Sequence, residues 1–300
     1  MESSILVVDT HKDIFDLVSE IFSAEGVEVR YARSADEALR AAEQNVPQVI
    51  MSGVDLPQND GFELLRSVKE KHPRIKRVLM SSYDVDSYVT QIRKHNIGNI
   101  LVKGSGFCSK EIRTYLRSLL KGDIFGLNRY FPGRRVHGEK ITSYSRAREI
   151  CSEIASLYPG GASVYLDIAA DELISNAVFH GVLQLTGTDR GEWSGDQPLS
   201  ESDAISVTWA CDDEKVGVSV VDTRGNLKKM DVLHWLYNSA EVECAFGEQE
   251  HGRGLLLIRR IIDRFIINID PGHRTECVIL QYFDKEHVAR QKPLLIHELA

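Results

Sequence analysis

The first 120 residues alternate between short apolar runs and amphipathic stretches. Residues 5–8 are apolar and end at Asp9, and the next segment places apolar side chains at helix spacing. Repeats of this pattern predict strands over 5–8, 27–31, 49–51, 78–80 and 100–102, and helices over 14–22, 34–44, 62–70, 85–94 and 110–120. Such alternation favours a doubly wound α/β fold, a five-stranded parallel sheet with helices on both faces. Any site is then expected at the carboxyl ends of the strands.

The pattern changes from about residue 141 onward. Apolar periodicity predicts helices over 142–158, 164–182, 230–239 and 254–264, and strands over 205–210, 217–221, 265–269 and 276–282. The last two strands flank a turn at Pro271-Gly272. Elements in this order predict an α+β domain with its helices packed on one face of a sheet.

Two domains are expected in a chain of 300 residues. We place the first at 1–121 and the second at 141–286. The glycine-rich stretch 122–140 is predicted to be a linker, because frequent glycine makes a continuous helix costly. Residues 183–203 lack periodicity and are predicted to be a flexible insertion. The pattern of the tail, 287–300, fits either a helix or a mobile segment.

Composition narrows the functional classes. A formal net charge of -8 provides no basic surface for nucleic acid, so a protein or a nucleotide is the expected partner. No apolar run is long enough to span a membrane, and residues 1–4 lead into the first strand without a basic leader, so a cytoplasmic protein is expected. The five cysteines stand singly, which disfavours a zinc site and a disulfide framework.

Residues at the predicted strand ends of the first domain form a specific pattern. They are Asp9, Leu56-Pro57, Asp60-Gly61, Ser82 and Lys103. Over essentially the whole first 120 positions, this pattern resembles the response-regulator receiver family of two-component signalling, whose fold is flavodoxin-like. In that family an aspartate four residues before the proline accepts phosphate, and two acidic residues after the first strand hold magnesium. The hydroxyl and the lysine bind the phosphoryl oxygens.

This sequence departs from the receiver pattern at three positions, one of which is Gly104, the residue after Lys103, where the family has proline. Gly53 stands at the phosphate-accepting position and has no carboxylate, and Thr10 stands at the second acidic position. We therefore expect a pseudo-receiver in which Asp9, Ser82 and Lys103 remain as a hydrogen-bonded cluster. The resemblance implies that such a domain provides a surface for protein interaction or for dimerisation. In the second case the chain forms a homodimer.

Polar residues interrupt the apolar face of the predicted helix 164–182. Glu172, Asn176 and His180 follow one another at helical spacing and share one stripe. An asparagine carbonyl is a hard oxygen suited to magnesium, and a glutamate one turn away can accept a proton from an attacking hydroxyl. An exposed polar stripe without chemistry is the competing interpretation.

Two further features follow along the chain. Asp222 stands at a strand end, where a carboxylate can accept a hydrogen bond from the exocyclic amine of adenine. Gly252 and Gly254 enter a predicted helix, where backbone amides and the helix dipole favour phosphate. Each feature alone is nonspecific.

The order and spacing of these motifs resemble the GHKL ATPase superfamily over nearly all of 140–285. The form E-L-x-x-N-A-x-x-H-G is most similar to the anti-sigma-factor serine kinases and implies the α+β GHKL sandwich. The resemblance implies that Glu172 is the general base and that Asn176 is the magnesium ligand. It also implies that Asp222 binds adenine and that Gly252 and Gly254 form the phosphate-binding turn.

The second domain also departs from its family. Arg224 stands where a glycine is usual, two residues after Asp222, although the adjoining Gly225 is assigned to the same nucleotide-binding turn. Leu256 replaces a further glycine of the phosphate-binding turn. These departures affect the expected nucleotide affinity more than the expected fold.

Two functions remain open at the level of sequence. In the first, the protein binds ATP and magnesium and phosphorylates serine or threonine of a protein partner of the anti-sigma antagonist type. In the second, it sequesters a sigma-factor-like regulator, or acts as a catalytically inactive scaffold in which ATP only sets conformation. A histidine kinase is disfavoured, because the predicted helix 142–158 contains no histidine.

Overall fold

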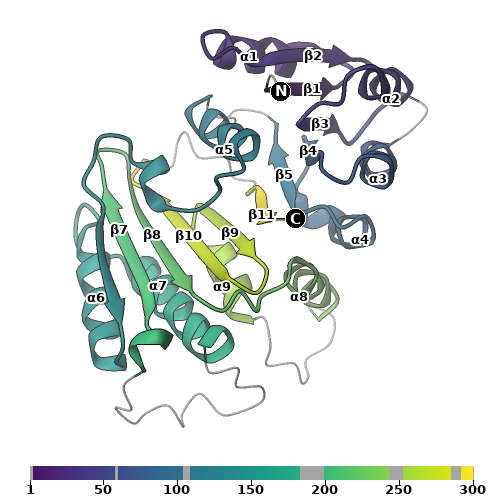
Figure 1. The fold of residues 1–300 in the computed structure, drawn as a ribbon. Helices are drawn as coiled ribbons and strands as arrows, with labels where there is room; N and C mark the ends of the chain where they lie inside the picture. The colour runs from purple at the N-terminus through teal and green to yellow at the C-terminus, as the bar shows by residue number, and fades with distance from the viewer. Residues whose placement is uncertain are drawn as a thin grey trace. The chain divides into compact units, whose positions relative to one another are not determined.

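The computed structural model describes residues 3–57, 60–103, 109–182, 199–242, 253–284 and 292–299. The described chain divides into two compact units, coloured by residue number in Figure 1. The first comprises the residues up to Ile124 together with 292–295, and the second runs from Phe125 to 284 and includes 296–299. The boundary falls inside the predicted linker 122–140, and most of that stretch belongs to the second unit.

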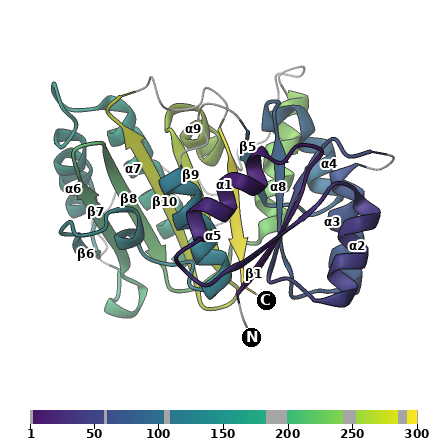
Figure 2. The ribbon, with the colours of Figure 1, turned by 90° about the horizontal axis from the view of Figure 1, so that it is seen from above.

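The first unit is a parallel sheet with helices on both faces. Its elements are β1 (Ser4–Val8), α1 (Asp13–Phe22), β2 (Glu28–Ala32), α2 (Ala35–Gln44), β3 (Val49–Gly53), α3 (Gly61–Lys71), β4 (Lys76–Ser81), a 3-10 turn (Val85–Tyr88), α4 (Val89–Lys94), β5 (Asn99–Val102) and α5 (Ser109–Lys121). The strands run in the order β2-β1-β3-β4-β5, and all are parallel. Figure 2 shows α1 and α5 on one side of β1, and α2, α3 and α4 on the other. The predicted doubly wound fold is therefore present.

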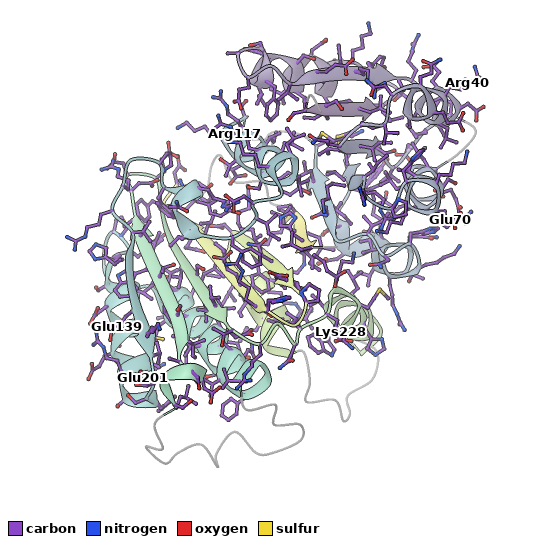
Figure 3. All side chains as sticks on the ribbon, in the orientation of Figure 1. Arg40, Glu70, Arg117, Glu139, Glu201 and Lys228 are labelled. Carbon is purple, nitrogen blue, oxygen red and sulfur yellow. The ribbon has the colours of Figure 1, made fainter. Side chains whose placement is uncertain are left out.

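Burial and capping explain these elements. Every residue of β1 and β3 is buried, as expected for strands covered on both faces. Ser34 caps α2 by accepting the backbone N–H of Glu37, and Asp60 caps α3 in the same way. Figure 3 shows Arg40 and Glu70 projecting outward from α2 and α3, on the polar faces of amphipathic helices.

The tail contains a strand that the sequence did not predict. This strand is β11 (Leu294–Glu298), and its first two residues, Leu294 and Leu295, pair antiparallel with β5 in the first unit. Both leucines are buried. A run of three apolar residues has too little periodicity to identify a strand, which forms here because β5 offers an edge.

The second unit is an antiparallel sheet with helices on one face. Its elements are a 3-10 helix (Leu127–Tyr130), β6 (His137–Ile141), α6 (Tyr144–Ser156), α7 (Val164–Asn176), a π-helical segment (Ala177–Val182), a second 3-10 helix (Glu201–Asp203), β7 (Ile205–Cys211), β8 (Lys215–Asp222), α8 (Lys229–Val242), α9 (Arg253–Ile261), β9 (Arg264–Asp270) and β10 (Arg274–Tyr282). The strands run in the order β9-β10-β8-β7-β6. Helices α6, α7 and α9 share one apolar core with β7, β8 and β10. Figure 1 shows these three helices on one face of the sheet.

The opposite face of this sheet carries part of the predicted linker. The ring of Phe131 is buried and lies against Gly217 of β8, where a methyl group would come within 2.4 Å of the ring. The buried carboxylate of Glu276 accepts the backbone N–H of Gly126, at 3.0 Å from each oxygen, and also binds Ser219 at 2.6 Å. Aromatic burial and a charge-assisted hydrogen bond thus fold a stretch whose glycines predicted a linker.

Helix α7 ends earlier than the sequence predicted. The α-helix stops at Asn176, and residues Ala177–Val182 continue it as a π-helix. Only 199–203 of the predicted insertion 183–203 are among the described residues, and they contain the short 3-10 helix.

Candidate functional site

Helix α7 presents the polar stripe that the sequence singled out. Glu172 and Asn176 are half-buried and one turn apart, so they lie on one face of α7. Ser163 caps the helix by accepting the backbone N–H of Leu166. His180 lies in the π-helical segment, and its side chain is outside the described part of the structure.

The side chain of Glu172 lies directly against the first turn of α9. A methyl group on Gly254 would come within 1.6 Å of Oε1 of Glu172 and within 2.3 Å of its Cδ. Only glycine leaves room for the carboxyl group at this position. The structure therefore brings two predicted site residues together that are far apart in the sequence.

Asp222 ends β8 and organises the turn after it. Its Oδ1 accepts the backbone N–H groups of Arg224 and Gly225, both at 2.9 Å. Gly225 has φ of +61°, and a methyl group there would lie 2.5 Å from the carbonyl oxygen of Asp270. The turn thus needs glycine both for its left-handed backbone and for this close approach.

Asp222 is buried and lies against the π-helical segment. Only 6% of the residue is exposed, and burial raises the pKa of its carboxyl above the ordinary value, although hydrogen bonds from the amides of Gly225 and Arg224 lower it in part. A methyl group on Gly181 would lie 2.9 Å from Cβ and Cγ of Asp222. Asn226 donates a hydrogen bond from Nδ2 to the carbonyl of Gly181 at 2.9 Å. The Asp222 turn is therefore joined to the end of the α7 segment.

Two residues that shape the candidate site had no role assigned from the sequence. Gly181 and Asn226 connect the π-helical segment to the Asp222 turn, and a glycine directly after His180 was the only available signal. The side chain of Arg224, at a position where glycine was expected, forms an ion pair with Asp203 at 2.5 Å. Gly252, predicted for the phosphate-binding turn, lies outside the described residues.

In the first unit, three predicted residues meet at the carboxyl ends of β1, β3 and β5. Lys103 Nζ lies 2.5 Å from Oδ2 of the buried Asp9, whose Oδ1 accepts the backbone N–H of His11. A methyl group on Gly53 would lie 3.0 Å from Asp9 Oδ2 and 3.2 Å from Lys103 Nζ. The carboxyl ends of these strands therefore hold an ion pair beside a position without a side chain.

Ser82, the remaining residue of the expected cluster, is more exposed than Asp9, Gly53 and Lys103. Ser82 is exposed directly after the strand. The buried Ser81 hydroxyl exchanges hydrogen bonds with the backbone of Tyr83, both at 3.0 Å. Asp55 is exposed and forms an isolated backbone bridge with Asp60.

The sequence of the first unit matches a known family. The family model of the response regulator receiver domain matches residues 5–116. Residues 5–116 form a response regulator receiver domain. Because Gly53 has no carboxylate, this receiver domain lacks a nucleophilic side chain at the end of β3.

The proteins similar to this chain include a bacterial regulatory protein and a receiver domain. The chain is 35% identical over 97 residues to the nitrogen assimilation regulatory protein NtrX of Azorhizobium caulinodans, covering 31% of this chain and 21% of that protein. It is 36% identical over 84 residues to an uncharacterized 14.6 kDa protein of Leptolyngbya boryana, covering 27% of this chain and 64% of that one. The receiver domain of NtrX from Brucella abortus is 32% identical, with a TM-score of 0.35, covering 39% of this chain and 98% of that chain. The chain thus spans about a fifth of the NtrX relative.

Two features are absent from the described residues. None of the helices within the described ranges is both long and apolar enough to cross a bilayer. The same residues contain no group of three His, Cys, Asp or Glu side chains placed to hold a metal ion.

Proposed function

We propose that the second unit binds ATP and magnesium and transfers the terminal phosphoryl group to serine or threonine of a protein partner of the anti-sigma antagonist type. One observation carries the proposal. Helix α7 and its π-helical continuation touch both the Asp222 turn, through Gly181, and the first turn of α9, through Glu172. Three motifs separated by up to 80 residues or so in sequence thus meet around one helix.

The Asp222 turn supports adenine recognition. Oδ1 is engaged by two backbone amides, and Gly181 lies against the other side of the carboxyl group, where a side chain would block approach. A buried acceptor of this kind suits the exocyclic amine of adenine and disfavours a carbonyl at that position, as in guanine. Gly225 supports the same turn by allowing its left-handed backbone.

The remaining residues suit the phosphate end of a nucleotide. Magnesium bound with ATP would neutralise charge on the phosphates, and the Asn176 carbonyl oxygen would ligate it. Glu172 would accept the proton of the attacking serine or threonine hydroxyl as the new bond to phosphorus forms. Gly254, with Gly252, would let backbone amides approach the phosphates at the start of α9.

The receiver domain would then act without phosphorylation of its own. Its family supports a role in response-regulator signalling. We propose that it supplies a fixed surface for a cytoplasmic protein partner or for a second copy of the chain. No nucleic acid enters this proposal, because the net charge is -8.

The test combines partner capture with phosphate transfer. The full chain is used to capture proteins from native cytoplasm, and the captured set is incubated with radiolabelled ATP and magnesium. We expect magnesium-dependent label, stable to acid, on serine or threonine of one captured protein. If calorimetry detects no binding of ATP with magnesium at millimolar concentration, the proposed function falls.

A catalytically inactive scaffold gated by nucleotide is the second candidate. It is favoured by Arg224, which replaces a glycine of the nucleotide turn and is held by Asp203. It is also favoured by Gly53, which removes phosphorylation as an input. This candidate takes precedence if ATP binds while Glu172→Ala changes neither hydrolysis nor transfer to any captured protein.

A further inference from the structure

The contact between Glu172 and Gly254 involves the whole end of the glutamate side chain. A methyl group on Gly254 would lie 1.6 Å from Oε1, 2.3 Å from Cδ and 2.9 Å from Cγ. Gly254 is the second residue of α9, so the carboxyl group lies against the first turn of that helix. A contact this close means that Glu172 and any other group cannot share the space beside Gly254.

Glu172 lies beside the N-terminal turn of α9, where negative charge is favoured. The first-turn amides of a helix have no acceptors within the helix, and the helix dipole favours negative charge there. A carboxylate is therefore stabilised in this position. A phosphate group is stabilised by the same two effects, which makes the carboxylate and a phosphate competitors for one place.

We propose that Glu172 is an autoinhibitory latch: its carboxylate closes the first turn of α9 in the nucleotide-free protein, and nucleotide phosphates bind only by displacing it. This inference rests on the proposed function, since it concerns regulation of the same nucleotide site. Displacement also frees the carboxylate to accept the proton of an incoming hydroxyl. The residue is thus withheld from chemistry until the nucleotide is in place.

The neighbouring acidic residue of α7 provides a matched control. Asp171 carries the same charge on the same helix, but its carboxylate is paired with Arg148 at 3.0 Å. Asp171→Asn therefore removes one negative charge from α7 without touching the Glu172 contact.

The first test measures nucleotide affinity of the full chain by calorimetry. Glu172→Gln should tighten binding of ATP with magnesium by about 2- to 30-fold, the range expected for one charge at a helix terminus. Adenosine, which has no phosphate, should bind the variant and the wild type equally. Asp171→Asn should leave both affinities unchanged. An unchanged or weaker affinity of Glu172→Gln for ATP overturns the latch.

The second test examines the contact without nucleotide. Gly254→Ala should lower the midpoint of urea unfolding in the wild-type background, because its methyl group overlaps the Glu172 carboxyl group. In the Glu172→Ala background the same change should cost much less, because the space is then empty. Equal costs in the two backgrounds would show that the contact is absent in solution, and the latch would be refuted.

The outcomes separate the latch from the proposed function. If the wild type binds ATP and Glu172→Gln binds it no better, the latch fails and nucleotide binding stands. If neither the wild type nor Glu172→Gln binds ATP with magnesium at millimolar concentration, nucleotide binding fails and the latch fails with it. The combination of coupled unfolding costs and phosphate-dependent tightening supports both.

Discussion

Replacing Asp222 with asparagine tests adenine recognition with almost no change in side-chain size. In the folded protein Oδ1 of Asp222 holds two backbone amides, those of Arg224 and Gly225, at 2.9 Å. The amide oxygen of asparagine can keep both hydrogen bonds if it takes the place of Oδ1. The amide nitrogen then replaces Oδ2 and turns an acceptor into a donor.

The expected magnitudes differ for folding and for binding. Each retained hydrogen bond weakens by about 1 kcal/mol when its acceptor becomes neutral, but the variant no longer buries a charge, so the two effects partly cancel. ATP loses a charge-assisted acceptor and meets a donor instead, which costs about 1.5 to 3 kcal/mol, or roughly 10- to 150-fold in Kd. Binding should therefore suffer more than stability.

The raised pKa of Asp222 adds a pH dependence with a definite sign. Since burial raises the pKa in the folded state, the protonated carboxyl favours folding, and this contribution is complete below the unfolded value of about 3.9. It is lost as the pH rises through the higher folded value. Asp222→Asn lacks this contribution, so its stability relative to the wild type should improve from acid toward neutral pH in urea unfolding series.

A second turn carboxylate serves as the control. Asp212, in the turn between β7 and β8, also accepts two backbone amides, those of Glu214 and Lys215, at 2.8 Å. Asp212→Asn should alter stability while leaving calorimetric binding of ATP unchanged. If Asp222→Asn binds ATP as tightly as the wild type and remains folded, Asp222 does not bind adenine, and the assignment is refuted.

Two further predictions concern the receiver domain and the second sheet. After incubation with acetyl phosphate and magnesium, intact-mass spectrometry should show no phosphate on the chain. Gly53→Asp should restore little phosphorylation, because Thr10 supplies no second carboxylate for magnesium. Stoichiometric phosphate on the wild-type chain would contradict this. Phe131→Ala should lower the free energy of unfolding by about 3 to 5 kcal/mol in urea titrations, because its buried ring packs on Gly217. A cost equal to that of Phe131→Leu would show that packing is not the cause.

Local sequence patterns predicted the first unit well. Its central strands β1 and β3 are short runs buried on both faces, and two of its helices, α2 and α3, are capped by Ser34 and Asp60. Both signals lie within about ten residues of the element that they define. The alternation of strand and helix then leaves few topologies.

The missed elements depend on distant partners. Strand β6 has only one buried residue, Ile141. It forms by pairing with β7, which follows it by about 60 to 70 residues in the sequence. Strand β11 forms by pairing with the edge strand β5, which precedes it by about 190 residues in the sequence. Neither carries enough apolar alternation of its own to be recognised.

The features of the candidate site also fall into two groups, those that local sequence predicts and those that depend on distant partners. Helical spacing sufficed to place Glu172 and Asn176 on one face, and a strand end sufficed for Asp222. The approach of Gly254 to Glu172, and of Gly181 to Asp222, arises from packing between elements. A sequence indicates that a glycine is present, but the neighbour that requires it is known only from the fold.

The anchored stretch from Phe125 to Phe131 changes where the second unit begins. Composition places its start at residue 141, whereas hydrogen bonding and burial place it at Phe125. A fragment cut at 141 would lose nearly all of β6 and the ring that covers Gly217, exposing an apolar sheet surface prone to self-association. The practical start of an autonomous second unit is therefore set by an aromatic side chain and one buried carboxylate, and lies upstream of every residue assigned to its chemistry.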